Sequence, residues 1–341
     1  MGQRLAQLTQ WVQTNWDQTQ SPDSAPLELE PVSGDASFRR YFRARTANSR
    51  FIAVDAPPLQ ENSHPFVEIG RRWRASGVAV PDIILADLEQ GFMLLEDFGD
   101  TMLLTSLDRA DSNPYRGALD VLLHLQQLSD DKLPFYDLAV LLREMRLFDE
   151  WFLERALGLD PNDWLPLLEP VYTRLIEQAT AQLQVPVHRD YHSRNLMVRE
   201  TGALGVIDYQ DALTGPITYD LVSLLRDSYI SWPDAQVEQW VEAYRQRLVQ
   251  VGFDLPDSEK FLKDFYLMGM QRQLKVLGIF CRLWLRDGKS GYLKDIPRTF
   301  DYLQRAAARY SEFAPLELAL NAMRPALLAH PLLGRHFGEQ S

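Results

Sequence analysis

The most informative stretch of the sequence is Pro186-Val-His-Arg-Asp-Tyr-His-Ser-Arg-Asn-Leu-Met-Val-Arg199, followed by Gly205-Val-Ile-Asp208. Within it, His188-Arg189-Asp190 and the later Asn195 have the spacing H-R-D-x-x-x-x-N, and Asp208 ends an apolar strand pattern thirteen residues after Asn195. The alternation of apolar runs and turn residues predicts a strand, a polar loop and a short hairpin. The fold is therefore expected to present an aspartate on a loop beside an amide and a second carboxylate.

This arrangement predicts a specific chemistry. Asp190 on its loop can accept the proton of a hydroxyl nucleophile. Asn195 and Asp208 would face each other across the hairpin and hold Mg²⁺, which bridges the phosphates of ATP. The spacing is that of the kinase catalytic loop. In the alternative, these residues are turn residues and a strand-end cap. That reading is disfavoured because a strand–loop–strand unit with a second Asp is far more specific than an isolated HxD.

The net charge limits the kinds of molecule that the protein is expected to bind. Of the 341 residues, 47 are Asp or Glu and 35 are Lys or Arg, which gives a formal charge of −12. A protein that follows a phosphate backbone needs a net basic face to release counterions, and the sequence has no dense basic run. We therefore expect small-molecule partners and no nucleic acid.

The N-terminal residues and the number of cysteines indicate where in the cell the protein is expected. Residues 1–16 are interrupted by Gln, Thr and Asn, so they resemble neither a signal peptide nor a membrane span. They predict a short amphipathic helix with a stripe of Leu5, Leu8, Val12 and Trp16. The single cysteine, Cys281, lies in an apolar helical run and is read as core filler. We expect a cytoplasmic, monomeric protein without a membrane partner.

The order of elements indicates two lobes. Strand patterns are expected at 27–30, 38–45, 50–56, 82–87 and 92–96, with one helix between the third and fourth. After Asp97-Phe98-Gly99-Asp100, helical patterns dominate, at about 113–128, 138–157, 162–184, 218–230, 234–251, 257–286 and 296–310. We therefore predict an α+β fold in which a small β-rich lobe, residues 1–97, precedes a larger helical lobe, residues 98–341. A cleft between lobes is the usual place for a small ligand.

The motifs around Asp190 resemble those of the aminoglycoside phosphotransferase and choline kinase superfamily, over nearly the whole chain. These small-molecule kinases have a bilobal fold like that of protein kinases. The resemblance to protein kinases themselves is weaker. The sequence has no G-x-G-x-x-G-x-V, Asp208-Tyr209-Gln210 stands in place of D-F-G, and no A-P-E follows.

Several segments are similar to the bacterial anomeric kinases that phosphorylate N-acetylmuramate and N-acetylglucosamine at C1 in cell-wall sugar salvage. They are Gly34-Asp-Ala-Ser-Phe-Arg-Arg-Tyr-Phe42, Val54-Asp-Ala-Pro-Pro58, Leu95-Glu-Asp-Phe-Gly-Asp100, Gln271-Arg-Gln-Leu-Lys-Val-Leu-Gly278 and Gly291-Tyr-Leu-Lys-Asp295. The resemblance implies an ATP- and Mg²⁺-dependent sugar kinase of peptidoglycan recycling. Alternatives are another acceptor (aminoglycoside, choline, homoserine or methylthioribose) or a catalytically silent nucleotide-binding regulator.

The resemblance also implies roles for individual residues. Asp190 would be the catalytic base, Asn195 and Asp208 the Mg²⁺ ligands, and Asp220 a brace for the catalytic loop. Arg194 could touch phosphate or sugar, or simply be exposed. A turn of Gly34, Asp35, Ser37 and Phe38 would cover the nucleotide phosphates, and a hinge containing Glu96 and Phe98 would meet the adenine.

One departure concerns the cation that protein kinases place on the third strand. The corresponding strand, Phe51-Ile-Ala-Val-Asp55, contains no Lys. Arg40 or Arg43 on the preceding strand could supply the charge, with Glu68 to orient it, although an Arg on such a strand is often solvated. The geometry of nucleotide binding is therefore open.

Acceptor-binding residues are expected in the helical lobe. Arg272, Lys275 and Arg282 lie in a long segment where basic and apolar residues interleave. They either form a solvated helix face or meet the carboxylate of N-acetylmuramate. Tyr292 could stack on the sugar or pack in the core, and Asp211 could position the acceptor or assist the metal.

Overall fold

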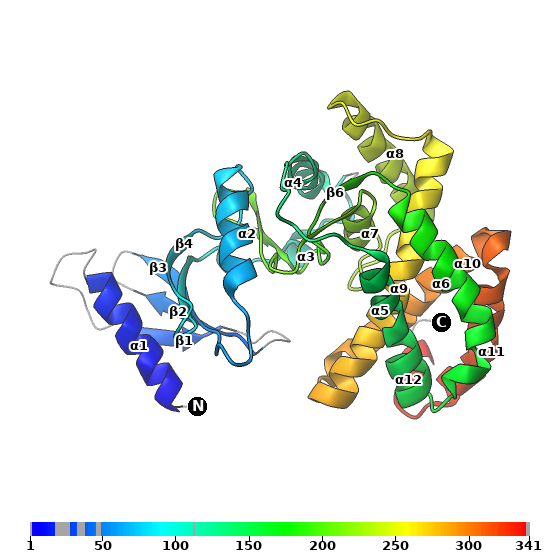
Figure 1. Ribbon diagram of the computed structural model, residues 1–341, viewed down its shortest axis with the longest axis horizontal. Coiled ribbons are helices and arrows are strands. Elements are labelled where there is room, and N and C mark those ends of the chain that lie inside the picture. Colours follow the sequence, from blue (N-terminus) through cyan, green and yellow to red (C-terminus); the bar gives the residue numbers. More distant parts are fainter. Residues whose placement is uncertain (1, 18–27, 33–37, 46–48, 112, 339–341) are drawn as a thin grey trace. The chain divides into compact units, whose positions relative to one another are not determined.

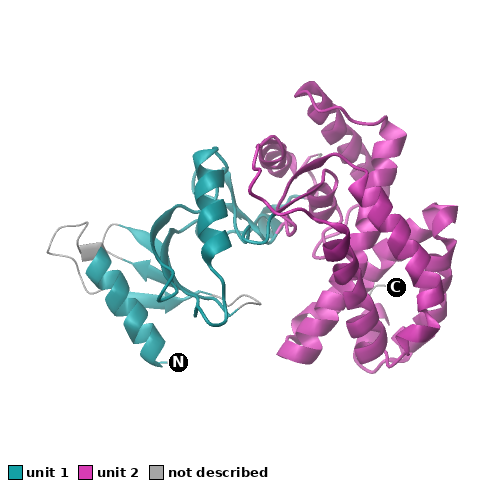
Figure 2. Ribbon diagram, in the orientation of Figure 1, with its two compact units in different colours: residues 1–108, 194–212 teal, residues 109–193, 213–341 magenta. Residues whose placement is uncertain are grey.

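The computed structural model describes residues 2–17, 28–32, 38–45, 49–111 and 113–338, and the chain forms two compact units (Figure 2). Unit 1 comprises Met1–Asp108 and Arg194–Ala212, and unit 2 comprises Arg109–Ser193 and Leu213–Ser341. A segment from the middle of the chain thus belongs to the same unit as the N-terminal residues. The predicted boundary between a nucleotide-binding lobe, residues 1–97, and a catalytic lobe, residues 98–341, stays a prediction. The two units are defined by how compactly the chain packs, whereas the two lobes are defined by function.

Unit 1 is built on a five-stranded antiparallel sheet in the order β1-β2-β3-β5-β4 (Figure 1). Three strands, one helix and two strands follow one another, as predicted. The elements are α1 (Gly2–Asp17), β1 (Glu28–Pro31), β2 (Arg40–Arg45), β3 (Arg50–Asp55), α2 (His64–Ala75), β4 (Ile83–Asp87), β5 (Phe92–Glu96) and α3 (Leu103–Ser106), with a hairpin of β7 (Leu196–Val198) and β8 (Leu204–Val206).

The N-terminal helix covers one face of this sheet. Leu8 and Val12 of α1 are buried in a cluster with Phe42, Phe92 and other strand residues. Helical spacing places the two on one stripe, which is why the stripe could be read from the sequence. The side chain of Trp16 lies outside the described residues.

Helix α2 holds the returning segment in place. Its apolar face, which includes Phe66 and Trp73, packs on Tyr209, with the rings of Phe66 and Tyr209 stacked at 4.9 Å. A Cβ on Gly70 would lie 2.3 Å from the Tyr209 hydroxyl oxygen, so only glycine allows this approach. Tyr209 follows Asp208, and the packing therefore positions the predicted metal ligand.

Unit 2 is mostly helical. Its strands β6 (Gln184–Val187) and β9 (Leu213–Pro216) pair antiparallel. Its helices are α4 (Arg116–Gln126), α5 (Leu138–Leu147) continued by the π-helical segment η1 (Phe148–Ala156), η2 (Pro161–Asp163), α6 (Leu165–Thr180), α7 (Tyr219–Leu225), α8 (Asp234–Gln250), α9 (Ser258–Asp287), η3 (Ser290–Asp295), α10 (Ile296–Arg309), η4 (Ser311–Phe313), α11 (Ala314–Ala329) and α12 (Leu333–Gly338).

Helix α9 is the central element of unit 2. Asp257 caps its N-terminus by accepting a hydrogen bond from the Lys260 N–H, and Gly288, in the left-handed conformation, ends it. Every residue from 264 to 278 is buried. A helix surrounded on all sides normally carries apolar residues there, so polar residues in this run need partners or a function.

Some elements differ from the sequence-based expectation. The predicted helix 218–230 ends at Leu225, because the chain then turns so that Asp227 can bind the catalytic loop. Strand β9 was not expected, since its Gly and Pro are typical of loops, and α11 and α12 were not identified. Cys281 is buried as expected, and burial raises the pKa of its thiol to about 12.

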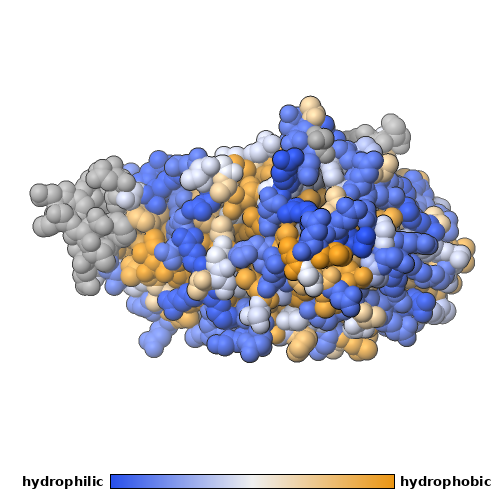
Figure 3. Space-filling view, turned by 90° about the horizontal axis from the view of Figure 1, so that it is seen from above, coloured by the Kyte–Doolittle hydropathy of each residue, from blue (hydrophilic) through white to orange (hydrophobic). Residues whose placement is uncertain are grey.

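The surface drawn in Figure 3 is mostly hydrophilic, with hydrophobic residues gathered in small areas between. Among the helices within the described ranges, none is both long and apolar enough to cross a bilayer.

Candidate active site

The predicted catalytic loop begins where β6 ends, and Asp220 holds it. The carboxylate of Asp220, fully buried in the first turn of α7, accepts the backbone N–H of His188 at 2.7 Å and that of Arg189 at 3.0 Å. Burial raises the pKa of Asp220 to about 6, although these two hydrogen bonds act in the opposite direction. An ionised Asp220 satisfies both donors, so the carboxylate braces the loop.

Asp190 is partly exposed, and its N–H donates to Nδ1 of His188 at 3.2 Å. Burial alone would raise its pKa, but Lys275 in the first place, then the interaction with His192 and the charges of Arg189 and Arg272, hold the pKa well below its usual range. Asp190 therefore stays ionised near neutral pH, as a group that must accept a hydrogen bond from a hydroxyl requires.

Arg189 connects this loop to a buried polar network. Its guanidinium pairs with Glu144 of α5, and Lys275 of α9 lies 3.2 Å from the same carboxylate and 3.0 Å from the Tyr219 hydroxyl oxygen. Burial would raise the pKa of Glu144, but Lys275 and Arg189 outweigh it and leave that pKa lowered. The network therefore keeps cations and a carboxylate ionised directly behind Asp190.

The backbone is strained at two places in the motif. Among the described residues, Arg189 (φ 77°) and Asp208 (φ 67°) are the non-glycine residues with positive φ. Side chains other than glycine rarely adopt this region, and such strain persists only where the surroundings enforce it. Arg189 directly precedes the predicted base Asp190, and Asp208 is itself a predicted Mg²⁺ ligand.

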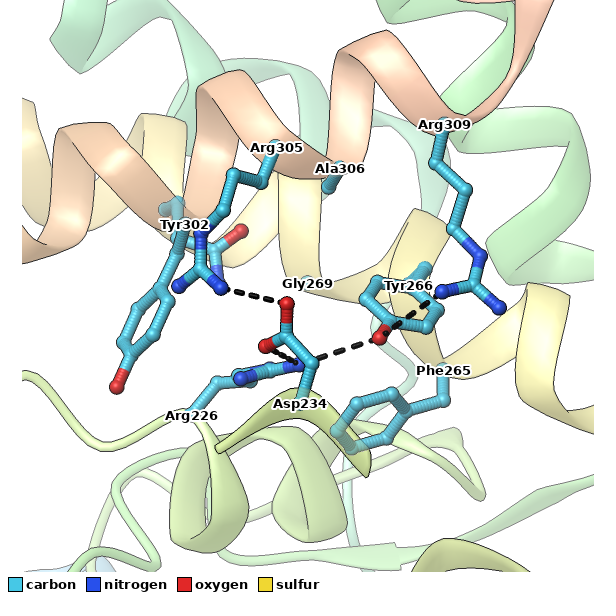
Figure 4. A pocket seen from close by; sticks show the side chains of 10 residues that line it. Arg226, Asp234, Phe265, Tyr266, Gly269, Tyr302, Arg305, Ala306 and Arg309 are labelled. Carbon is cyan, nitrogen blue, oxygen red and sulfur yellow. Dashed lines mark hydrogen bonds and ion pairs between the residues drawn. The ribbon is translucent and has the colours of Figure 1, made fainter. Parts of the chain in front are cut away.

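The end of the loop is held by the segment after α7. Ser193 donates from its N–H, at 3.0 Å, and from its hydroxyl to the buried carboxylate of Asp227. The preceding Arg226 pairs with Asp234 at 2.7 Å, beside a cavity of about 110 Å³ (Figure 4). Arg305 contacts the same Asp234 at 2.6 Å. None of the described site residues predicted from the sequence lines this cavity, whose ion pairs instead anchor the segment that binds Ser193.

The predicted metal ligands come together in unit 1. Asn195 Nδ2 lies 3.4 Å from Asp208 Oδ2, and Gln210 Nε2 donates to Asp208 Oδ1 at 2.8 Å. Among the residues that the structure describes, no cluster of three or more His, Cys, Asp or Glu side chains could hold a metal. One carboxylate and one amide oxygen fit Mg²⁺, which keeps several waters and takes phosphate oxygens as further ligands.

The expected turn over the phosphates is described only in part. Gly34, Asp35 and Ser37 lie outside the described residues. Phe38 is 63% exposed, and its N–H donates to Glu61 at 2.8 Å.

The two candidate cations on β2 both pair with carboxylates. Arg40 pairs with Asp55 at the end of β3, and Arg4 of α1 donates to the same buried carboxylate at 2.8 Å. Arg43 lies 2.6 Å from Asp97, and Asp100 and Asp97 raise its pKa. These pairs connect α1, β2 and the chain after β5, and a role for either arginine at the phosphates stays a prediction. Glu68, expected to orient them, is exposed.

The hinge residues pack against the β7–β8 hairpin. Glu96 pairs with Arg199 at 2.7 Å, and the Arg199 guanidinium lies over the Phe98 ring at 4.8 Å. Phe98 is buried, and a Cβ on Gly205 would lie 2.3 Å from its ring. This packing ties the segment after β5 to the hairpin that carries Asn195.

The predicted acceptor residues lie in different settings. Asp211 is exposed and Arg194 partly exposed, both in unit 1. Arg272 and Lys275 are buried in α9, whereas Arg282 is half-buried. Tyr292 stacks on Phe280 with ring centroids 5.3 Å apart.

Sequence reasoning missed Glu144, Asp227 and Arg4. Glu144 had a detectable signal, because it is an acidic residue on the apolar face of a predicted helix. Asp227 and Arg4 had none, since their partners are distant in sequence.

The sequence is similar to those of known phosphotransferases over most of its length. Residues 28–260 match the family described as "Phosphotransferase enzyme family". A protein of Pseudomonas aeruginosa named N-acetylmuramate/N-acetylglucosamine kinase is 44% identical over 295 residues, which cover 85% of this chain and 87% of that protein. A protein of Neisseria meningitidis with the same name is 40% identical, over 89% of this chain and 92% of its own.

Solved structures share the fold at low identity. Choline kinase LicA from Streptococcus pneumoniae has a TM-score of 0.61 at 15% identity, over 90% of this chain and 99% of that chain. The ADP-bound aminoglycoside phosphotransferase APH(2'')-Ib has a TM-score of 0.55 at 13% identity, over 86% and 97%. The predicted α+β fold of the kinase-like type is confirmed.

Proposed function

Because the chain belongs to the phosphotransferase enzyme family, we propose that it is an ATP- and Mg²⁺-dependent kinase that phosphorylates the C1 hydroxyl of N-acetylmuramate and N-acetylglucosamine. The reaction would return cell-wall amino sugars to metabolism in peptidoglycan recycling. The enzyme would act as a monomer in the cytoplasm, where ATP is available.

The braced loop around Asp190 is the observation that carries this proposal. Asp220 fixes the backbone at His188 and Arg189, and Asp227 fixes Ser193, so the loop is held on both sides of Asp190. Nearby cations keep Asp190 ionised. A fixed and ionised carboxylate can orient a hydroxyl toward a phosphorus atom, and positioning is the main source of rate in phosphoryl transfer.

The reaction proceeds by in-line displacement. The C1 oxygen forms a bond to the γ-phosphorus as the bond from that phosphorus to the ADP oxygen breaks, and the hydroxyl proton passes to the Asp190 carboxylate. An anomeric hydroxyl is more acidic than an ordinary alcohol. A carboxylate with a low pKa is a weak base, so Asp190 contributes chiefly by orienting this hydroxyl.

Asn195 and Asp208 would hold Mg²⁺, which neutralises charge on the phosphates when bound. The turn of Gly34, Asp35, Ser37 and Phe38 would cover the phosphates, and the hinge at Glu96 and Phe98 would meet the adenine. For the remaining candidates, Arg194 would contact phosphate or sugar, and Asp211 would support the metal or the acceptor.

The charge behind Asp190 favours a neutral or anionic acceptor. Arg272, Lys275 and Arg189 all act on Asp190 as positive charges, and Glu144 is shared between Lys275 and Arg189. Choline and aminoglycosides are cations, and like charges in a desolvated site repel. These acceptors are therefore disfavoured relative to an amino sugar whose nitrogen is acetylated.

A coupled ADP-release assay tests the proposal. It compares N-acetylmuramate, N-acetylglucosamine, glucose, choline and kanamycin, with and without Mg²⁺. We expect turnover of the two acetylated sugars, loss of the reducing end in the product and a ³¹P signal coupled to the anomeric proton. Activity confined to choline or kanamycin would refute the acceptor. A nucleotide-dependent shift of the melting temperature without turnover of any acceptor would indicate a silent regulator.

A further inference from the structure

Arg272 is a buried cation with two donor nitrogens that no described residue accepts from. Only 3% of the residue is exposed, and its Nε and Nη1 lie buried without a hydrogen-bond partner among the described residues. One turn further along α9, Lys275 has both a carboxylate and a hydroxyl as partners. Leaving a buried guanidinium without an acceptor is unfavourable, so a protein that retains one normally uses it.

The position of Arg272 relates it to the catalytic loop. It lies about one turn before Lys275 on α9, and Lys275 shares Glu144 with Arg189, the neighbour of Asp190. Its positive charge also contributes to lowering the pKa values of Asp190 and His192. The buried donors of Arg272 therefore belong to the part of α9 that is linked to the catalytic loop through Lys275, Glu144 and Arg189.

A second unsatisfied group lies in the same loop. His192 Nδ1 is buried without a hydrogen-bond partner in the part of the chain that the structure describes. Burial lowers the pKa of this imidazole, so it is neutral at pH 7 and can donate one hydrogen bond. A guanidinium and a neutral imidazole together present donors suited to an anion with several oxygens.

Aromatic rings continue from His192 along this side of unit 2. The His192 ring meets Tyr229 edge-on at 5.3 Å, Tyr229 lies 6.4 Å from Phe280, and Phe280 stacks on Tyr292. Phe280 is eight residues after Arg272 on α9, a spacing that places both on one helix face. The row would give the apolar face of a sugar ring a surface on which to pack.

We infer that Arg272, together with His192 of the catalytic loop, receives a carboxylate carried by the acceptor and thereby discriminates N-acetylmuramate from N-acetylglucosamine. The inference rests on the proposed function. The two sugars share the reacting C1 hydroxyl and the acetamido group, but only N-acetylmuramate has a lactyl ether at O3, which ends in a carboxylate. A guanidinium donates strong, charge-assisted hydrogen bonds to a carboxylate.

A competing role for Arg272 is to bind the phosphoryl group during transfer. The phosphoryl group is common to both reactions, so in that role the loss of Arg272 would lower turnover of both sugars equally. A carboxylate contact affects one sugar selectively and acts mainly on KM, because the contact is made in the ground state as well as the transition state. The ratio of kcat/KM for the two sugars therefore distinguishes the roles.

The test compares wild type, Arg272→Gln and Arg272→Lys on both sugars, with Arg286→Gln as the control. Arg286 is an exposed cation on the same helix, bonded to Asp287. We expect the preference for N-acetylmuramate, as a ratio of kcat/KM, to fall about tenfold to a hundredfold in Arg272→Gln, the range for a hydrogen bond to a charged group, and less in Arg272→Lys. The control keeps the wild-type ratio.

A second measurement does not depend on a variant. The methyl ester of N-acetylmuramate keeps the lactyl group but has no charge. With wild-type enzyme its kcat/KM should fall by a similar factor, and Arg272→Gln should no longer distinguish acid from ester. Equal losses on both sugars, or an unchanged ratio, would overturn the inference. If wild type turned over neither sugar, the proposed function itself would fail.

Discussion

Replacing Asp220 by Asn separates loop positioning from overall stability. The carboxylate accepts two backbone N–H groups, from His188 and Arg189. An amide offers one oxygen to these two donors and turns its NH₂ group toward the other, so one hydrogen bond is lost and the loop must shift. Because Asp190 follows directly, we expect kcat to fall about a hundredfold, the effect of misplacing a reacting group by about 1 Å.

The stability change is expected to be small at neutral pH, since two effects oppose each other. Raising the pKa of Asp220 from 3.8 to about 6 means that its ionisation in the folded state costs about 3 kcal/mol, at about 1.36 kcal/mol per unit. Asn removes this cost. It also loses one hydrogen bond to a charged group, worth about 1.5–3 kcal/mol. Above pH 6, the removed ionisation cost and the lost hydrogen bond therefore nearly cancel in the free energy of unfolding.

The raised pKa of Asp220 also sets the direction in which the stability of the protein changes with pH. A folded-state pKa above the unfolded value means that the folded protein binds the proton more tightly. The contribution of Asp220 to stability is therefore greatest below pH 4, falls as pH rises from about 4 to 6, and is constant above. Asp220→Asn should match the wild-type melting temperature at pH 7.5 and fall below it at pH 4.5.

Activity provides the second readout. Protonated Asp220 cannot accept both N–H groups, so kcat of the wild type should decline below about pH 6, whereas Asp190 is ionised throughout that range. The assay is ADP release from pH 5 to 8, with differential scanning fluorimetry and the exposed Asp131→Asn as control. An acidic limb that persists in Asp220→Asn, or wild-type turnover by that variant, would refute the bracing role.

Three further predictions follow from the site and the fold. Asp190→Asn should leave ATP binding, measured by calorimetry, nearly intact while turnover falls at least about a hundredfold; wild-type turnover would exclude the assigned role. Asp208→Asn should raise the half-saturating Mg²⁺ concentration in the ADP-release assay at least about tenfold, and an unchanged titration would remove it from the metal site. Gly205→Ala places a Cβ 2.3 Å from the Phe98 ring and should lower the free energy of unfolding by about 1–3 kcal/mol, whereas Gly291→Ala, with open space around it, should not.

The ease of prediction differed between the parts of the fold. Strand alternation and helical stripes located β1 to β5, α2 and the central helix α9 within a few residues, because these patterns follow from burial of one face. Strand β9 was not predicted, because Leu213–Pro216 is extended through its pairing with β6. Local propensity alone favours a loop for a segment with Gly and Pro.

The sequence by itself predicted the chemistry that we propose for Asp190, Asn195 and Asp208, because that prediction depends on the type and spacing of these side chains. The tertiary structure decided how they are supported. Asp220 and Asp227 reach the loop from about thirty residues away, and Glu144 from a different helix. The tertiary structure also decided which cations are already paired. Arg40, Arg43 and Lys275 have carboxylate partners, whereas Nε and Nη1 of Arg272 are buried without an acceptor among the described residues. Spacing along the chain cannot distinguish these cases, because ion pairing and desolvation depend on distances that only the folded chain establishes.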